Sequence, residues 1–293
     1  MFSVVITTKD RLDFLTRAFI SICDSSETPI DLVIVNDGGA TLFRTDLPKA
    51  DFNVIIHNNQ VSKGANYSRN LGIELATTEI IFLLDDDDAF TTDSFSNRLK
   101  LFKDKEVGVV YTGAQLVSDI DLTKVRRVLS DCIPSPTLQD LLTKGNVVGS
   151  TSRVAVRKSH FTSAGKFDES LNCLQDYDLW LRMSMRSKIL YDGKAGILYT
   201  IHSNGNQISS NYLKYLETGE VLLSKYDTIL GEFSARKKFR SRLYFRVSLS
   251  ASGNNEIAKY KFACLSFFDS PNIKSLIFAV IPTMLLKRLY SYV

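Results

Sequence analysis

Four consecutive aspartates, Asp85 to Asp88, follow an unbroken apolar run at residues 80–84. Carboxylates crowded in this way repel one another, and the repulsion is costly unless a cation lies close by. Their hard oxygen atoms suit Mg²⁺ or Mn²⁺. An acidic run standing alone is more often a solvated turn. Its position directly after a buried strand changes that balance and indicates a divalent-metal site.

Charged side chains also gather where other strands are expected to begin or end. They are Asp10 and Arg11 after residues 3–7, Asp37 after residues 32–35, and Lys63 and Arg69 ahead of residues 80–84. The carboxyl ends of parallel strands meet at one edge of a sheet, so these groups are expected near the acidic run. The basic groups suit phosphate, although each is equally explained as surface charge, and Asp37 as a turn former. Their joint placement at successive strand ends indicates a site.

The spacing of apolar residues predicts the elements that position these side chains. Short apolar runs typical of strands stand at residues 3–7, 32–35, 54–56 and 80–84. Helical spacing separates them at residues 12–22 and 65–76. The run at 80–84 is apolar throughout, so both faces of its strand are expected to be covered. This alternation predicts a Rossmann-like α/β fold, with helices on both faces of a mostly parallel sheet that continues less regularly after residue 100.

Length and composition agree with a packed enzyme or binding domain. The chain has 293 residues, 44% of them hydrophobic and 23% charged, and a net charge of +4 that alone does not indicate a nucleic-acid partner. Its four cysteines match no zinc or redox spacing, which favours free thiols in a reducing cytosol. The start of the sequence has no basic segment followed by a long apolar one, as a secretion signal would have. We therefore expect a cytoplasmic protein.

The pattern changes after residue 210 to helical segments, so we predict a catalytic domain at residues 1–210 and a helical region at 211–293. Residues 236–246 mix basic and aromatic side chains without an acidic one. Such a segment suits nucleic acid, an anionic membrane surface, or simply a solvated face of a core helix. The apolar residues 276–286, interrupted by Pro282 and followed by Lys287 and Arg288, are too short to span a bilayer and favour peripheral membrane association.

Five segments, taken in order, resemble the signature segments of family 2 glycosyltransferases with the GT-A fold. They lie at residues 3–11, 33–38, 63–70, 82–88 and 175–182, and the resemblance spans residues 2–210. It implies a GT-A fold with a C-terminal helical appendage. It also implies an inverting enzyme that moves a hexose-type sugar from a nucleoside diphosphate donor, expected to be a UDP-sugar, with Mn²⁺ or Mg²⁺ as cofactor.

The resemblance also implies a role for each matched residue. Residues implied to bind the nucleotide sugar are Thr7, Asp10, Arg11, Asp37, Lys63, Arg69, Asp85 and Asp86. Asp87 corresponds to the metal ligand of the DxD motif, and His202 to a late histidine that helps to hold the metal or diphosphate. Asp176 corresponds to the general base, although many relatives have Glu where this chain has Gln175. From the residues alone, Asp176 is more simply an N-terminal helix cap.

These implications define the expected function and its rivals. The acceptor is expected to be a saccharide hydroxyl on a lipid-linked carrier at the inner face of a bacterial membrane, in the assembly of O-antigen or capsule. A sugar nucleotidyltransferase is one rival, but residues 8–14 lack the glycines that would cradle a triphosphate. A nucleic-acid-binding module built on the basic C-terminal region is the other, and we expect no nucleic-acid partner.

Overall fold

The computed structural model describes residues 1–130, 132–202 and 211–290, and the chain divides into two compact units. The first unit comprises residues 1–137, 148–169 and 179–201. The second comprises residues 138–147, 170–178 and 202–293. Two short stretches of the region predicted as the catalytic domain therefore group with the C-terminal helices.

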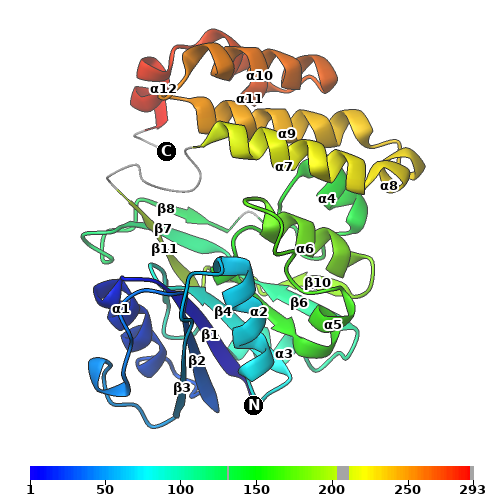
Figure 1. The fold of residues 1–293 in the computed structure, drawn as a ribbon. Helices are drawn as coiled ribbons and strands as arrows, with labels where there is room; N and C mark the ends of the chain where they lie inside the picture. Colours follow the sequence, from blue (N-terminus) through cyan, green and yellow to red (C-terminus); the bar gives the residue numbers. More distant parts are fainter. Residues whose placement is uncertain (131, 203–210, 291–293) are drawn as a thin grey trace. The chain divides into compact units, whose positions relative to one another are not determined.

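A seven-stranded sheet forms the centre of the first unit, in the order β10-β6-β9-β4-β1-β2-β3 (Figure 1). Its strands are β1 (Ser3–Thr8), β2 (Asp31–Asn36), β3 (Asn53–Asn58), β4 (Ile80–Asp85), β6 (Val107–Tyr111), β9 (Val154–Arg157) and β10 (Lys188–Tyr191). All neighbouring pairs are parallel except those of β9, which runs antiparallel to β4 and β6. The predicted mostly parallel, mixed α/β sheet is confirmed.

Helices cover both faces of this sheet because alternate strand residues point to opposite sides. Val4 and Ile6 of β1 share a core cluster with Leu15 of α1 (Leu12–Cys23). On the other face, α2 (Ala65–Leu75) packs so closely that a Cβ added to Gly72 would stand 2.4 Å from Cγ1 of Val5. Both sides of the central strands are thus buried, which explains the continuous apolarity of residues 80–84. Two shorter helices, α3 (Ser96–Leu101) and α5 (Lys158–Ser163), and the part of α6 (Gln175–Ser184) from residue 179 on also belong to this unit.

A four-stranded sheet in the order β5-β11-β7-β8 adjoins the acidic run. Its strands are β5 (Ala89–Phe90), β7 (Ala114–Ser118), β8 (Arg127–Leu129) and β11 (Ile197–Ile201). Asp85 ends β4, and Asp86 to Asp88 connect it to β5. The acidic run therefore leads from the large sheet to the small one. The strands expected to continue after residue 100 are present, but β6 and β7 belong to different sheets.

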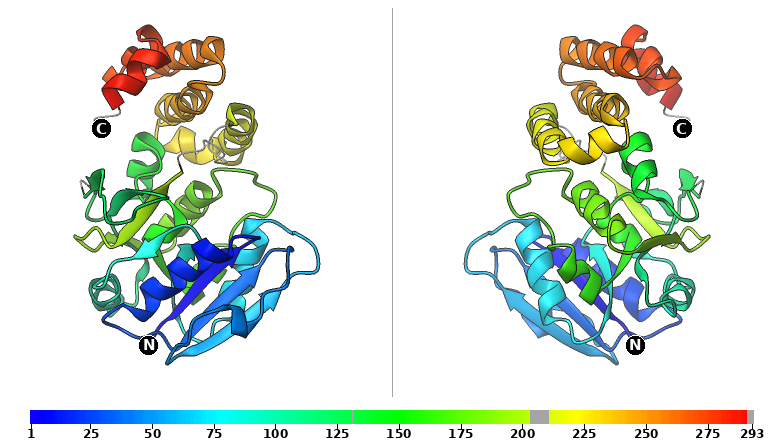
Figure 2. Two further views of the ribbon diagram at one scale, coloured as in Figure 1. Left: turned by 90° about the vertical axis from the view of Figure 1, so that its left-hand side faces the viewer. Right: turned by 90° about the vertical axis from the view of Figure 1, so that its right-hand side faces the viewer.

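The second unit is helical, apart from its connecting segments (Figures 1 and 2). Its helices are α4 (Leu138–Lys144), the first turn of α6 (Gln175–Ser184), α7 (Tyr212–Lys225), α8 (Asp227–Glu232), α9 (Arg236–Ala251), α10 (Glu256–Asp269), α11 (Ile273–Val280) and α12 (Thr283–Tyr290). Helix α9 packs between α7 and α10. Among the described residues, no helix combines the length and the apolarity needed to cross a bilayer.

The arginines of α9 serve contacts within this unit. Arg240 forms an ion pair with Asp269 of α10, with its Nε 2.7 Å from Oδ2. Arg242 donates to the Thr143 carbonyl at 3.2 Å, and Arg246 donates to the Tyr215 hydroxyl at 3.0 Å. The basic segment, considered above for a membrane or nucleic-acid surface, therefore matches best the alternative of a packed helix with basic side chains.

Candidate active site

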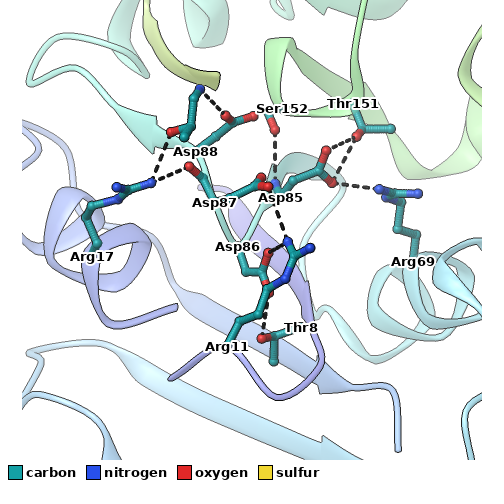
Figure 3. A network of polar contacts seen from close by, with 11 residues as sticks. Thr8, Arg11, Arg17, Arg69, Asp85, Asp86, Asp87, Asp88, Thr151 and Ser152 are labelled. Atoms are coloured by element: carbon teal, nitrogen blue, oxygen red, sulfur yellow. Dashed lines mark hydrogen bonds and ion pairs between the residues drawn. The ribbon is translucent and has the colours of Figure 1, made fainter. Parts of the chain in front are cut away.

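The acidic run forms the turn between β4 and β5, at the carboxyl edge of the large sheet (Figure 3). Asp85 is the last residue of β4, and the backbone N–H of Asp88 donates to its carbonyl at 3.1 Å. In the register of the sheet, Thr7 of β1 stands between Asp85 of β4 and Val35 of β2. Thr7 therefore lies at the same edge as the acidic run, as predicted.

Asp85 is fixed by residues from two other elements. Arg69 of α2 donates to its carboxylate at 2.6 Å, and the Thr151 hydroxyl donates at 3.0 Å (Figure 3). The Ser152 hydroxyl accepts a hydrogen bond from the Asp85 backbone N–H at 3.0 Å. Asp85 and Arg69, which were both expected at this edge, are in contact. Thr151 lies 66 residues after Asp85, just before β9, and only the fold brings it to this carboxylate.

Arg11 bridges the middle two carboxylates of the run. Its Nη1 lies 3.2 Å from a carboxylate oxygen of Asp86 and 3.2 Å from one of Asp87 (Figure 3). Burial raises the pKa of Asp86 to about 6, even though the Thr8 hydroxyl donates to it at 2.8 Å. Asp87 is the more accessible of the two, with 22% of its side chain exposed against 7%. Asp87 is therefore the carboxylate better placed to meet a ligand.

Asp88 ties the run to the small sheet. Its side chain is buried and accepts a hydrogen bond from the Thr200 backbone N–H of β11 at 2.8 Å. Burial, followed by the charges of Asp87 and Asp85, raises the pKa of Asp88 well above its ordinary value. Arg17 of α1 donates to the Asp87 carbonyl at 2.5 Å and to the Thr200 hydroxyl at 3.0 Å, which closes the network (Figure 3).

Asp37 organises the loop that leads into α2. Its carboxylate accepts five hydrogen bonds, from the side chains of Asn59, Ser62 and Ser68 and from the backbone N–H groups of Lys63 and Gly64. Burial alone would raise the pKa of Asp37, but these hydrogen bonds outweigh it and lower the pKa. The loop approaches closely, since a Cβ on Gly38 would lie 2.4 Å from the Ser62 nitrogen. Asp37 therefore fixes the shape of the loops at this edge of the sheet, which we call the rim, and adds a negative charge there.

Asp10 and Lys63 lie on the two loops of this rim. Asp10 adopts a positive φ of 54°, and its carboxylate accepts the Ala40 backbone N–H at 2.9 Å. That hydrogen bond requires a glycine at position 39, because a Cβ there would stand 2.3 Å from Oδ1 of Asp10. The Lys63 ammonium lies over the Tyr67 ring, 4.4 Å from its centroid. In this arrangement Asp10 links the loops after β1 and β2, and Lys63 is exposed at the rim.

Asp176 stands in the first turn of α6, within the second unit. The helix begins one residue earlier, at Gln175, so Asp176 is inside the turn rather than at the cap position. Its Oδ2 accepts a hydrogen bond from Asn146 Nδ2 at 2.9 Å. Tyr177 anchors the same turn, because its hydroxyl donates to the Leu141 carbonyl at 2.7 Å and its ring stacks on Phe239.

Asp178 anchors this turn through buried polar contacts. Its side chain is fully buried, and its carboxylate meets the Tyr226 hydroxyl at 2.7 Å and the Lys225 ammonium at 2.8 Å. Both partners come from the end of α7 and the residue after it. One turn further along α6, Arg182 donates to the Ala164 carbonyl.

His202 follows β11 directly and groups with the second unit. Within the described residues, no group of three or more His, Cys, Asp or Glu side chains is arranged to hold a metal ion. The donor set nevertheless suits such an ion, because the β4–β5 turn concentrates carboxylate oxygens at one strand end. Mg²⁺ is commonly held by one or two carboxylates together with substrate phosphates, so a protein cage of three ligands is not required.

Sequence reasoning missed several residues of this network. Arg17 lies in the apolar pattern of α1, and nothing in its spacing separates it from a surface arginine. Thr151 and Ser152 precede β9, 66 and 67 residues after Asp85. Only Thr8 carried a usable signal, since it directly follows the first predicted strand.

The fold is a mixed α/β fold of the GT-A type, with charged groups at the carboxyl ends of β1, β2 and β4. Residues 3–162 match the family described as Glycosyl transferase family 2, which is more than half of the chain. The chain belongs to this family and is a glycosyltransferase, as the resemblance implied.

Relatives and solved structures agree with this assignment. An uncharacterized glycosyltransferase of Bacillus subtilis, YwdF, is 25% identical over 211 residues, covering 71% of this chain and 77% of the relative. A glucosyl-dolichyl phosphate glucuronosyltransferase of Haloferax volcanii is 34% identical over 91 residues, 29% of this chain and 28% of the relative. The structure of S. aureus TarS 1–349 with UDP-GlcNAc has a TM-score of 0.60 at 15% identity, covering 95% of this chain and 89% of TarS 1–349. A longer TarS structure is covered to 54% of its length. These likenesses support the fold.

Proposed function

We propose that this glycosyltransferase moves a hexose-type sugar from a UDP-sugar to a hydroxyl of a saccharide acceptor, with inversion. The observation that carries the proposal is the joining of Thr7, Asp37, Arg69 and the acidic turn at one edge of the sheet. Such an edge is where nucleotides bind in α/β folds of this kind. The UDP-GlcNAc complex of TarS supports the choice of a UDP-sugar.

On the donor side, the chain supplies both shape and charge. Asp37 holds the loop at residues 59–64 in a fixed conformation, and this loop would form one wall against the base and ribose. Arg69 and Arg11 bring positive charge to the turn, where a diphosphate would lie. Lys63 would add a third cation from the rim.

A divalent cation fits this donor set, with Asp87 as the proposed ligand and His202 as a second candidate. When bound, Mn²⁺ or Mg²⁺ supplies Lewis-acid stabilisation of the charge that develops on the diphosphate leaving group. Arg11 already offsets part of the negative charge on Asp86 and Asp87, so its guanidinium would share that task.

Asp176 is proposed as the general base that takes the proton from the attacking hydroxyl. Inversion, by direct displacement at the anomeric carbon, is what the resemblance to family 2 glycosyltransferases implies, and a general base acting on the acceptor hydroxyl fits that course. Asn146, Tyr177 and Asp178 hold the turn on which Asp176 lies, so its carboxylate is positioned by the second unit. The acceptor is proposed to be a lipid-linked saccharide in bacterial surface polysaccharide assembly, such as O-antigen or capsule, at the cytoplasmic face of the membrane.

A donor screen tests this proposal most directly. Nucleotide release would be measured for a series of UDP- and other nucleoside diphosphate sugars, with Mn²⁺ or Mg²⁺ and with lipid diphosphate saccharides as acceptors. We expect release with a UDP-hexose that rises when acceptor is added. Release that never depends on acceptor, for any donor, would contradict transfer to a saccharide hydroxyl.

We expect Asp37→Asn to weaken the binding of UDP and of the UDP-sugar to a similar extent, by about 10- to 100-fold. The amide turns one acceptor into a donor and so breaks hydrogen bonds that fix residues 59–64. Isothermal titration with UDP measures the loss, and Asp51→Asn on an exposed loop is the matched control. An unchanged affinity for UDP would return Asp37 to the role of a turn residue.

A further inference from the structure

We propose that the outer face of α11 is a docking surface for an anionic lipid bilayer. This α11 face is defined by Ile273, Leu276 and Val280, which recur at helical spacing along one side. Ile273 and Val280 are 66% and 65% exposed, and Leu276 is 41% exposed. The inference rests on the proposed lipid-linked acceptor, and it names where the protein would meet the membrane that holds that acceptor.

The α11 face is the outer side of a helix whose inner side is firmly packed. Phe278 meets Phe245 of α9 edge to face, with ring centroids 5.3 Å apart. Ser275 is buried, and its hydroxyl lies 2.7 Å from that of Ser266 on α10. Asn272 caps the first turn by accepting the Ser275 backbone N–H. The exposed apolar row is therefore held in place by the fold and does not come from an undocked helix.

Two more exposed apolar side chains flank α11 in the sequence. Phe268, in the last turn of α10, is 80% exposed, and Met284, in the first turn of α12, is 78% exposed. Exposed apolar side chains that share one side of a helix, as those of the α11 face do, mark an interaction surface more often than a plain solvated one. Helix α11 has eight residues, a length of about 12 Å, against about 30 Å for a bilayer core. It would lie in the lipid interface and not cross it.

The positive charge of the segment that contains α11 favours an anionic lipid surface over a second copy of the chain as the binding partner. After Asp269 the sequence contains Lys274, Lys287 and Arg288 and no acidic residue. Lys274 is exposed and neighbours Ile273 at the start of the α11 face. Two copies docked through this segment would bring like charges together, whereas anionic head groups would attract them. An apolar row with an exposed lysine beside it, in a segment of net positive charge, is the pattern of an interfacial helix.

Vesicle binding by the full chain tests the proposal. The protein would be sedimented with vesicles of phosphatidylcholine alone, or of phosphatidylcholine and phosphatidylglycerol at about two to one. We expect binding to the anionic vesicles, reduced more than about tenfold in the double variant Ile273→Glu with Val280→Glu. Lys274→Ala is expected to reduce it by about fivefold. Ile120→Glu, at an 84% exposed position of the first unit, is the matched control and should bind as the wild type does.

Three results would overturn the proposal. The first is undiminished vesicle binding by the double variant, and the second is equal binding to both kinds of vesicle. The third is a wild-type dimer in sedimentation velocity that the double variant no longer forms. The last would assign the α11 face to a second copy. Titration with UDP keeps this test separate from the proposed function, because all three variants should bind UDP normally. Loss of vesicle binding with normal UDP affinity would concern the α11 face alone.

Discussion

Asp176→Asn should lower the turnover number by about 10²- to 10⁴-fold while leaving the affinity for the UDP-sugar nearly unchanged. The amide keeps the size of the side chain and can still contact Asn146, but it cannot accept a proton from the acceptor. Steady-state kinetics with saturating donor, together with titration of UDP, would separate the two effects. The thermal unfolding midpoint should stay close to that of the wild type, since Asp176 is not the residue that anchors the turn.

Asp140→Asn is the matched control for this experiment. Asp140 lies in the first turn of α4, in the same unit, and pairs with Lys144 on the surface at 2.8 Å. Near wild-type turnover in Asp176→Asn would contradict the base assignment. Asp178 would not be the natural replacement, because its buried carboxylate is committed to Tyr226 and Lys225.

Asp87→Ala should reduce transfer by at least about 10³-fold, because the proposed cation would lose its carboxylate ligand. Treatment of the wild type with a chelator should have the same effect, and added Mn²⁺ should restore activity to the wild type alone. Asp87 is partly exposed, so the variant should remain folded, which circular dichroism and thermal unfolding would check. Asp93→Ala, at an exposed position shortly after the turn, is the control.

The two arms of this experiment distinguish two roles of Asp87. Full wild-type activity in chelator, with loss of activity in Asp87→Ala, would contradict the metal assignment. It would point instead to the ion pair of Asp87 with Arg11, which Arg11→Ala would then test. Activity retained in both arms would remove the acidic turn from the catalytic proposal.

The sequence predicted those parts of the site that depend on local pattern. The apolar run at 80–84 identified β4 as buried on both faces, and with it the place of Asp85 to Asp88. The pairing of Asp85 with Thr151, and of Asp178 with Tyr226, joins residues 66 and 48 positions apart, and no spacing rule reports such contacts. The same limit applies to α9, where Arg240 finds its partner 29 residues away.

The sharing of α6 between the two units has a consequence for the order in which the protein matures. Residues 175–178 group with the C-terminal helices, whereas residues from 179 group with the sheet. During synthesis, the strands of the first unit are made before Tyr226 and Phe239. The turn with Asp176 therefore cannot acquire its final anchors until α7 to α9 emerge. A released chain that ends before residue 226 should bind UDP yet lack a formed catalytic turn.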